Sequence, residues 1–142
     1  MKAVDAEITS RASRDRYVEL LLSMTGVDVF AALLIRSEIG DVSRFSSYKK
    51  LICWAGLAPS LHQSGSVEYH GRITKQCSRM LRRIMVGVAQ AQVHKYDISI
   101  MRAYNRIAER KGRRIAVVVA ARRLLMCCYS VLRNKRPYHD QT

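Results

Sequence analysis

Proline is scarce in this sequence of 142 residues, which contains only Pro59 and Pro137. Because proline breaks helices, long stretches of the chain are free to be helical. Long apolar runs are missing as well. The longest one near the C-terminus, Ile115 to Ala121, ends at two arginines, whereas a membrane span needs about 20 apolar residues. The N-terminus also lacks the apolar core of a signal peptide. We therefore expect no membrane partner and a cytoplasmic, nucleoid-associated protein.

Carboxylates are few. Asp and Glu number 11 against 25 Lys and Arg, which gives a formal net charge of +14. Most of the acids lie in the first 41 residues, so the later half is almost purely basic. A folded domain with this charge attracts a polyanion, and nucleic acid is the commonest one. A solvated basic surface or a ribosome-associated protein is the alternative, and charge alone does not separate DNA from RNA.

Cysteine patterns that bind metals are absent. The four cysteines form no C-x-x-C pair, and the four histidines do not complete a zinc spacing. We expect reduced cysteines that lie mostly in the core, and no metal or cofactor in this chain. A zinc site built from Cys77, His62 and His70 is the remaining alternative. The cysteines are Cys53, Cys77, Cys127 and Cys128.

Apolar residues make up 49% of the chain, enough to fill a core. Their periodicity predicts an all-α, compact multi-helix domain. The first helix, over about 5–24, is either the end of a longer helix or a short dimerising helix. The last, over 114–133, is apolar over most of its surface and should be central. We expect a single domain over 1–142, with a lead-in helix (1–24), a helix-hairpin-helix-like part (25–57), a Ser/Gly loop (58–74), a helical core (75–133) and a tail (134–142).

A glycine turn is expected to join the first two helices. Gly26 breaks the first helix, and Thr25 or Asp28 can cap the second, which runs to Ile39. Such a turn points backbone N–H groups at a phosphate, so Gly26 is a candidate DNA-phosphate contact. A plain αα-hairpin inside the core is the alternative. Asp28 would repel a bound phosphate, although it makes a good cap. A third helix is expected to begin at a Ser46 cap.

The segment from Ala58 to Thr74 is rich in Ser, Gly and His and lacks helical periodicity. We expect an exposed loop, with a short β-hairpin around 67–73 as a variant, and Thr74 as the cap of the next helix. The loop runs into a helix start rich in basic side chains, which suits phosphate binding. A solvated basic face is the alternative. The candidate phosphate-binding side chains here are Arg72, Lys75, Arg79, Arg82 and Arg83.

Short motifs follow one another in a specific order. Thr-Gly-Val (25–27), Glu-Ile-Gly-Asp (38–41) and Arg-Phe (44–45) come first. Ala-Gly-Leu-Ala-Pro (55–59), Ser-Gly (64–65), Gly-Arg-Ile-Thr-Lys (71–75) and Leu-Arg (81–82) follow, and then Lys-Gly (111–112) and Arg-Leu-Leu (123–125). From about Leu20 to Tyr138 the sequence resembles the C-terminal domain of the "one-ten" family of insertion-sequence transposases. Each motif alone is weak, and their combination is specific.

This resemblance implies one half of an active site. The family's full-length members pair such a domain with an N-terminal nuclease-like domain that carries an acidic metal-binding quartet, so Mg²⁺ is expected only there. The resemblance further implies that the serine of the Ser-Gly motif, Ser64, attacks a DNA phosphodiester and becomes covalently linked to DNA during transposition. Some members use a structured guide RNA. The expected partners are DNA, a nuclease-like domain or chain, a guide RNA and a second copy of the chain.

The local residues suit this chemistry. A serine hydroxyl is a weak nucleophile that needs activation and stabilisation of developing charge. Ser64 is the expected nucleophile, and Ser66 and Ser60 are the fallbacks. Ser-Gly is otherwise an ordinary turn sequence. The candidate clamps are Arg72, Lys75 and Arg82, and the candidate proton acceptors are His62 and His70.

Three departures from the family pattern matter. The chain has no acidic quartet, Cys77 stands where glycine is usual, and Gly26-Val27-Asp28 replaces Gly-x-Gly. We therefore do not expect activity from this chain alone. The second hypothesis is a module that binds DNA, guide RNA or a partner subunit without chemistry of its own. The third is a basic helical protein that assembles with other proteins.

Overall fold

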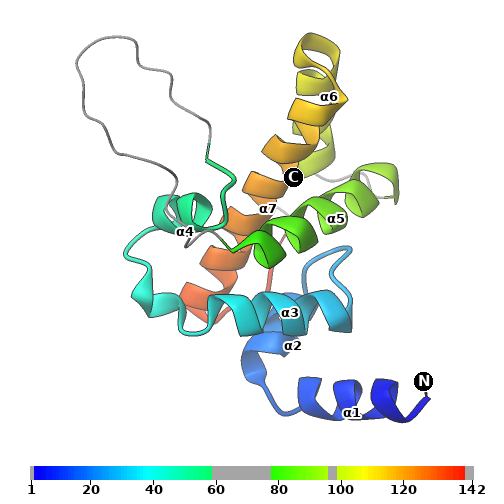
Figure 1. The fold of residues 1–142 in the computed structure, drawn as a ribbon, viewed down its shortest axis with the longest axis vertical. Helices are drawn as coiled ribbons and strands as arrows, with labels where there is room; N and C mark the ends of the chain where they lie inside the picture. Colours follow the sequence, from blue (N-terminus) through cyan, green and yellow to red (C-terminus); the bar gives the residue numbers. More distant parts are fainter. Residues whose placement is uncertain (1, 59–77, 96–98, 140–142) are drawn as a thin grey trace.

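The computed structural model describes residues 2–58, 78–95 and 99–139 (Figure 1). Within these ranges the chain forms seven α-helices, one short 3-10 helix and no strand. The predicted all-α fold is therefore confirmed. The variant β-hairpin at 67–73 falls outside the described residues.

The N-terminal part is two helices, α1 (Lys2–Ala12) and α2 (Arg16–Leu22). The prediction of one helix over 5–24 is wrong because Asp15 starts a new one. Its carboxylate accepts a hydrogen bond from the N–H of Tyr17 at 2.8 Å. A side chain that satisfies the free N–H groups of a helix start fixes the boundary there.

Helix α3 (Val29–Ile39) follows a tight turn at Gly26, whose φ is +80°. Asp28 caps the helix, because its carboxylate accepts a hydrogen bond from the N–H of Ala31 at 2.7 Å. Helices α2 and α3 pack against each other, and α1 packs against α3. A pair of helices joined by a tight glycine turn is therefore present, as expected.

A 3-10 helix, η1 (Val42–Arg44), and helix α4 (Tyr48–Trp54) come next. The N-cap residue of α4 is Ser47, and its side chain makes no capping hydrogen bond. The expected cap at Ser46 is therefore wrong. Gly56, with φ of +68°, directly follows the end of the helix.

Helix α5 (Arg79–Lys95) begins later than expected. Ser78 directly precedes it, and the Ser78 hydroxyl accepts a hydrogen bond from the N–H of Leu81 at 3.0 Å. Ser78 is therefore the cap, and the expected cap at Thr74, which itself falls outside the described residues, is wrong. Near the end of α5, Gln92 is buried, while its neighbour Ala91 is exposed.

Helix α6 (Ser99–Lys111) and helix α7 (Arg113–Asn134) form a hairpin around Gly112, whose φ is +91°. Helix α7 packs against α2, α4, α5 and α6, and Figure 1 shows it running through the middle of the fold. The predicted central core helix is confirmed. Its buried residues are Ala116, Ala120, Ala121, Leu124, Leu125, Cys128, Val131 and Leu132.

In the described part of the chain, α7 alone has the length and apolar composition of a membrane span, with a mean hydropathy of 1.9 in its most apolar window. Within the fold, 44% of that window is buried. Central helices of water-exposed domains meet the same criterion. The core position of α7 explains its composition.

Candidate nucleic-acid interface

Three arginines stand in the first turns of α5, at the place where the sequence predicted a phosphate-binding surface. Arg79, Arg82 and Arg83 are all exposed. None of them forms an ion pair with a carboxylate of the described residues. Their charge is therefore available to a partner, and the positive end of the helix dipole adds to it.

Ser78 joins the start of α5 to two other elements. Its backbone N–H donates a hydrogen bond to the carbonyl of Trp54, at the end of α4, at 2.9 Å. Its hydroxyl donates to Oε2 of Glu38, in α3, at 2.6 Å. Leu81 N–H binds the same hydroxyl. The residue that follows segment 59–77 is thus held by α3, α4 and α5 together.

The residues before that segment are held just as firmly. Leu57 is fully buried, and its N–H donates to the carbonyl of Ile52 at 3.0 Å. The Leu57 carbonyl accepts a hydrogen bond from Nε of Arg122, in α7, at 2.9 Å. Both flanks of segment 59–77 are therefore fixed to the helical core.

Arg44 was not expected to belong to this region. Its guanidinium carbon lies 4.7 Å from the ring centroids of both Phe45 and Trp54, and its Nη2 donates to the carbonyl of Glu38 at 3.3 Å. The two rings are 5.5 Å apart. Cation–π contacts of this kind orient an arginine without neutralising it. Arg44 therefore presents a fixed positive charge beside the residues that bind Ser78.

Local sequence could not reveal this cluster. Arg44 and Phe45 are neighbours in the chain, but Trp54 reaches them only through the packing of α4. Tyr129, in α7, completes the arrangement, since its hydroxyl donates to the carbonyl of Phe45 at 3.1 Å. These contacts join segments far apart in sequence, and no helical spacing signals them.

The glycine turn lies at the other end of α5. Gln92 is 1% exposed, and its amide donates to the carbonyl of Thr25. Arg79 precedes Gln92 by 13 residues on the same helix, so about 20 Å of helix separates the two. The structure therefore does not bring Gly26 together with the arginines of α5.

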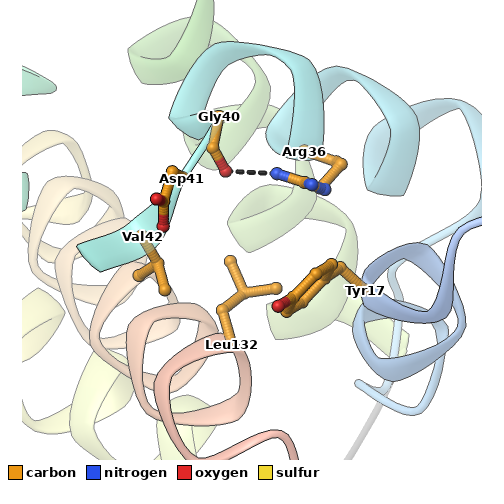
Figure 2. Close-up of a pocket in the computed structure, with 6 residues that line it drawn as sticks. All are labelled: Tyr17, Arg36, Gly40, Asp41, Val42 and Leu132. Carbon is orange, nitrogen blue, oxygen red and sulfur yellow. Dashed lines mark hydrogen bonds between the residues drawn. The ribbon is translucent and has the colours of Figure 1, made fainter. Parts of the chain in front are cut away.

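A hollow of about 310 Å³ opens beside α3 and η1, and Figure 2 shows Arg36 and Tyr17 on one side of it and Asp41 on the other. Arg36 already has its partners. It donates to the Gly40 carbonyl, pairs with Asp15 through Nε at 3.0 Å, and stacks over the Tyr17 ring at 4.6 Å. This arginine serves the fold and is not free to bind an anion.

Asp41 caps η1 at the edge of the same hollow. Its carboxylate accepts a hydrogen bond from the N–H of Ser43 at 2.9 Å. This bond is the main cause that lowers the pKa of Asp41 below its ordinary value, and Arg36 and Arg133 contribute through their charge. The acid is thus ionised, which further disfavours an anion in the hollow.

The cysteines are distributed differently from the expectation. Cys128 is fully buried, with its Sγ 3.6 Å from Sδ of Met24, and burial raises the pKa of its thiol, with Cys127 adding to the effect. Cys127 is partly buried, but Cys53 is exposed. The prediction that the cysteines lie mostly in the core is therefore wrong for Cys53. Among the described residues, no group of His, Cys, Asp and Glu could hold a metal ion.

The remaining site residues predicted from the sequence fall in segment 59–77, outside the described residues. The expected nucleophile and its two fallbacks are among them, as are two clamps and both candidate proton acceptors. Cys77 also belongs to this segment, and with it the alternative zinc site. These residues are Ser64, Ser60, Ser66, Arg72, Lys75, His62 and His70.

Taken together, the described residues define an all-helical domain of a strongly basic chain, with three exposed arginines without a carboxylate partner in the first turns of one core helix. Comparison with known sequences identifies the protein family of this domain. The family described as "Transposase IS116/IS110/IS902 family" matches residues 18–106, and the chain belongs to that family.

Curated relatives agree with this assignment. The chain is 33% identical over 140 residues to the insertion element IS900 uncharacterized 42 kDa protein of Mycobacterium paratuberculosis, covering 97% of the chain and 35% of that protein. It is 28% identical to the pilin gene-inverting protein of Moraxella bovis, covering 93% of the chain and 40% of that protein. It is 26% identical to the insertion element IS110 uncharacterized 43.6 kDa protein of Streptomyces coelicolor, covering 99% of the chain and 35% of that protein.

The chain thus spans 35% to 40% of the length of these three relatives. No solved structure is significantly similar to it.

Proposed function

We propose that this chain is the DNA-binding, C-terminal part of an insertion-sequence transposase, and that it contributes Ser64 as the nucleophile of DNA strand exchange. It works with a nuclease-like domain, in the same or another chain, which supplies the acidic residues and Mg²⁺. The described residues offer no metal site, so no step of this proposal passes through a metal held by them. A guide RNA and self-association are further proposed partners, and the place of action is the nucleoid.

One observation carries the proposal. Both flanks of the segment that contains Ser64 are bound to the core: Leu57 to Arg122 on one side, and Ser78 to Trp54 on the other. A nucleophile must be held within a fraction of an ångström of its target to be effective. Fixed flanks limit the volume that the segment between them can reach, and the exposed arginines of α5 begin directly after it.

The proposed reaction is a transesterification. The Ser64 hydroxyl loses its proton and its oxygen forms a bond to a DNA phosphorus, while the bond from that phosphorus to a deoxyribose oxygen breaks and the leaving oxygen takes up a proton. The phosphate gains negative charge in the transition state. Guanidinium groups positioned beforehand stabilise that charge. Arg79, Arg82 and Arg83 are proposed for this role and for binding, together with Arg72 and Lys75. The backbone of Gly26 is proposed as a separate contact with another DNA phosphate, because the turn lies at the other end of α5.

Substitution of the serine tests the chemistry. The chain is mixed with a nuclease-like domain of the same family and labelled DNA, and covalent protein–DNA product is measured on a denaturing gel. Ser64→Ala is expected to abolish the product and to leave DNA affinity within about twofold, since a hydroxyl contributes little beside the charges. Ser60→Ala and Ser66→Ala are the matched controls. If Ser64→Ala still forms the product, the assignment is wrong.

A binding module without chemistry is the second candidate. The observation that favours it is the share of the relatives covered, because 35% to 40% of a protein need not contain a complete active site. Under this hypothesis the wild-type chain binds DNA in a salt-dependent manner. It also forms no covalent product with any nuclease-like domain.

A further inference from the structure

The turn between α6 and α7 carries a dense group of positive charges. Arg110 and Lys111 end α6, and Arg113 and Arg114 begin α7, with only Gly112 between them. All four side chains are exposed. Figure 1 shows the α6–α7 hairpin projecting at one end of the molecule, away from the start of α5.

The requirements of folding do not explain two of these charges. Cations at the end of a helix are favourable, which accounts for Arg110 and Lys111. Arg113 and Arg114 stand at the beginning of a helix, where the dipole repels them. The first turn of α7 contains no acid, and Gly112 provides no side-chain cap. Two arginines therefore occupy positions that oppose the electrostatics of their own helix.

One acid lies near the turn, since Glu109 and Arg113 line the same hollow. In the described part of the chain, none of the four forms an ion pair with a carboxylate, although Glu109 is adjacent in sequence. Two further exposed arginines, Arg102 and Arg106, precede Arg110 at steps of four residues along α6. Steps of four residues place one arginine about every 6 Å along nearly the same face of the helix.

The space beside the turn is open. A hollow of about 570 Å³ between α5 and α7 is lined by Gln90 and His94 on one side and by Arg113 and Arg114 on the other. Both arginines therefore have room to reorient, and two further polar side chains face the same space.

We propose that the α6–α7 turn, with the arginine row of α6, is a second contact with the sugar-phosphate backbone of duplex DNA, separate from the start of α5. Segment 109–115 contains no aromatic residue, and Tyr104, which lines the hollow beside the turn, is only 9% exposed. Single strands are bound by stacking on accessible aromatic rings, which this surface does not offer in the described residues. Unpaired cations on a projecting hairpin suit the uniform charge of a duplex. The inference rests on the proposed DNA-binding function and adds a second surface to it.

Salt dependence tests the contact. The full chain is titrated with a short DNA duplex of arbitrary sequence at several salt concentrations. Each phosphate contact contributes about 0.9 to the slope of log K against log salt, so Arg113→Gln/Arg114→Gln is expected to make the slope shallower by about 2. The matched control is Arg133→Gln/Arg136→Gln, which removes the same charge from exposed residues at the other end of α7. Its slope is expected to change by less than half as much.

Thermal unfolding separates a lost contact from a lost fold. Because the dipole repels Arg113 and Arg114, their replacement is expected to leave the melting temperature unchanged or to raise it. A lower melting temperature together with weaker binding would count against a direct contact. An equal change of slope in the test and control variants would overturn the inference.

Two further outcomes distinguish this inference from the proposed function. If the wild-type chain binds no duplex DNA, the proposed function fails and this inference fails with it. If the wild-type chain binds duplex DNA, but Arg113→Gln/Arg114→Gln changes the salt slope no more than its control does, this inference fails and the proposed function stands. An RNA duplex is titrated in parallel, and a loss of binding confined to RNA would overturn the assignment to DNA.

Discussion

Gln92 lies so close to Gly26 that no side chain fits between them. A Cβ atom placed on Gly26 would stand 2.7 Å from Cγ of Gln92. The Gln92 amide binds the Thr25 carbonyl, so the turn between α2 and α3 is fixed against α5. In the described residues, Oε1 of Gln92 has no hydrogen-bond partner. The packing of the turn against Gln92 therefore requires glycine at position 26, independently of any contact with a phosphate.

Gly26→Ala tests this packing. The substitution combines a φ of +80° with the close approach of Gln92, and it is expected to lower the free energy of unfolding by about 1–3 kcal/mol. The measurement is urea unfolding followed by circular dichroism. Gly87→Ala is the matched control. Gly87 lies in α5 with no atom near its Cβ position, so alanine there is expected to raise stability by about 0.5–1 kcal/mol. Equal effects would contradict the packing argument.

Ser78→Ala removes the cap of α5 and the hydrogen bond to Glu38. Loss of a serine cap costs about 1 kcal/mol, with a range of about 0.5–2 kcal/mol. Ser37→Ala is the control, because the Ser37 hydroxyl is exposed and donates only to the Leu34 carbonyl. Its effect is expected to stay within about 0.5 kcal/mol. Denaturant midpoints measure both variants, and a neutral Ser78→Ala would place the start of α5 elsewhere.

Asp15 has two separable roles, since one oxygen caps α2 and the other pairs with Arg36. Asp15→Asn keeps a capping oxygen and loses the ion pair, so its expected cost is below about 1 kcal/mol. Asp15→Ala loses both and is expected to cost about 1–2 kcal/mol. Thermal unfolding at low and high salt compares them. The difference between wild type and Asp15→Asn should shrink only in part at high salt, because the Arg36 and Asp15 side chains are 27% and 33% exposed and a partly buried ion pair is screened less than an exposed one.

The ionised carboxylate of Asp41 should make the stability of the fold depend on pH. Its pKa is lowered in the folded chain, first by the hydrogen bond from the Ser43 backbone. Its ionised form therefore stabilises the fold above the unfolded pKa of about 4, and this stabilisation is lost as the pH falls through the lower folded value. Asp41→Asn should be less stable than wild type at pH 7, with a smaller difference at pH 3. Paired urea titrations at the two pH values measure it, and a difference independent of pH would refute the role of the charge.

These caps also show which helix boundaries could be predicted from the sequence and which could not. Apolar spacing located the end of α3 and both ends of α7 to within a residue, because buried apolar residues determine each helix. It missed the break between α1 and α2. Ser13, Arg14 and Asp15 do not interrupt an amphipathic pattern, and the choice of Asp15 as a cap depends on Arg36, 21 residues later.

The start of α5 was misplaced for the same reason. Thr74 and Ser78 are both good capping residues, and local sequence does not choose between them. The choice depends on contacts of Ser78 with Trp54 and Glu38, which lie 24 and 40 residues earlier in the chain. Likewise, the charge of Arg44 was visible in the sequence, but its position over Trp54 was not.

The arginines of α5 give the last prediction, which concerns DNA. Arg82 and Arg83 are exposed and unpaired in the described part of the chain. Arg82→Gln/Arg83→Gln is expected to make the slope of log K against log salt shallower by about 2 for any duplex sequence, because phosphate contacts do not depend on the bases. Stability should stay within about 0.5 kcal/mol, as for most surface substitutions.

The control for this prediction is Arg14→Gln/Arg16→Gln, which removes the same charge from exposed residues around the start of α2. A general loss of net charge weakens attraction in both variants, whereas a lost contact affects only the α5 variant. Fluorescence anisotropy with two duplexes of unrelated sequence provides the measurement. If the two variants lose equal slope, the start of α5 does not bind phosphate. A loss limited to one duplex would instead assign Arg82 and Arg83 to base recognition.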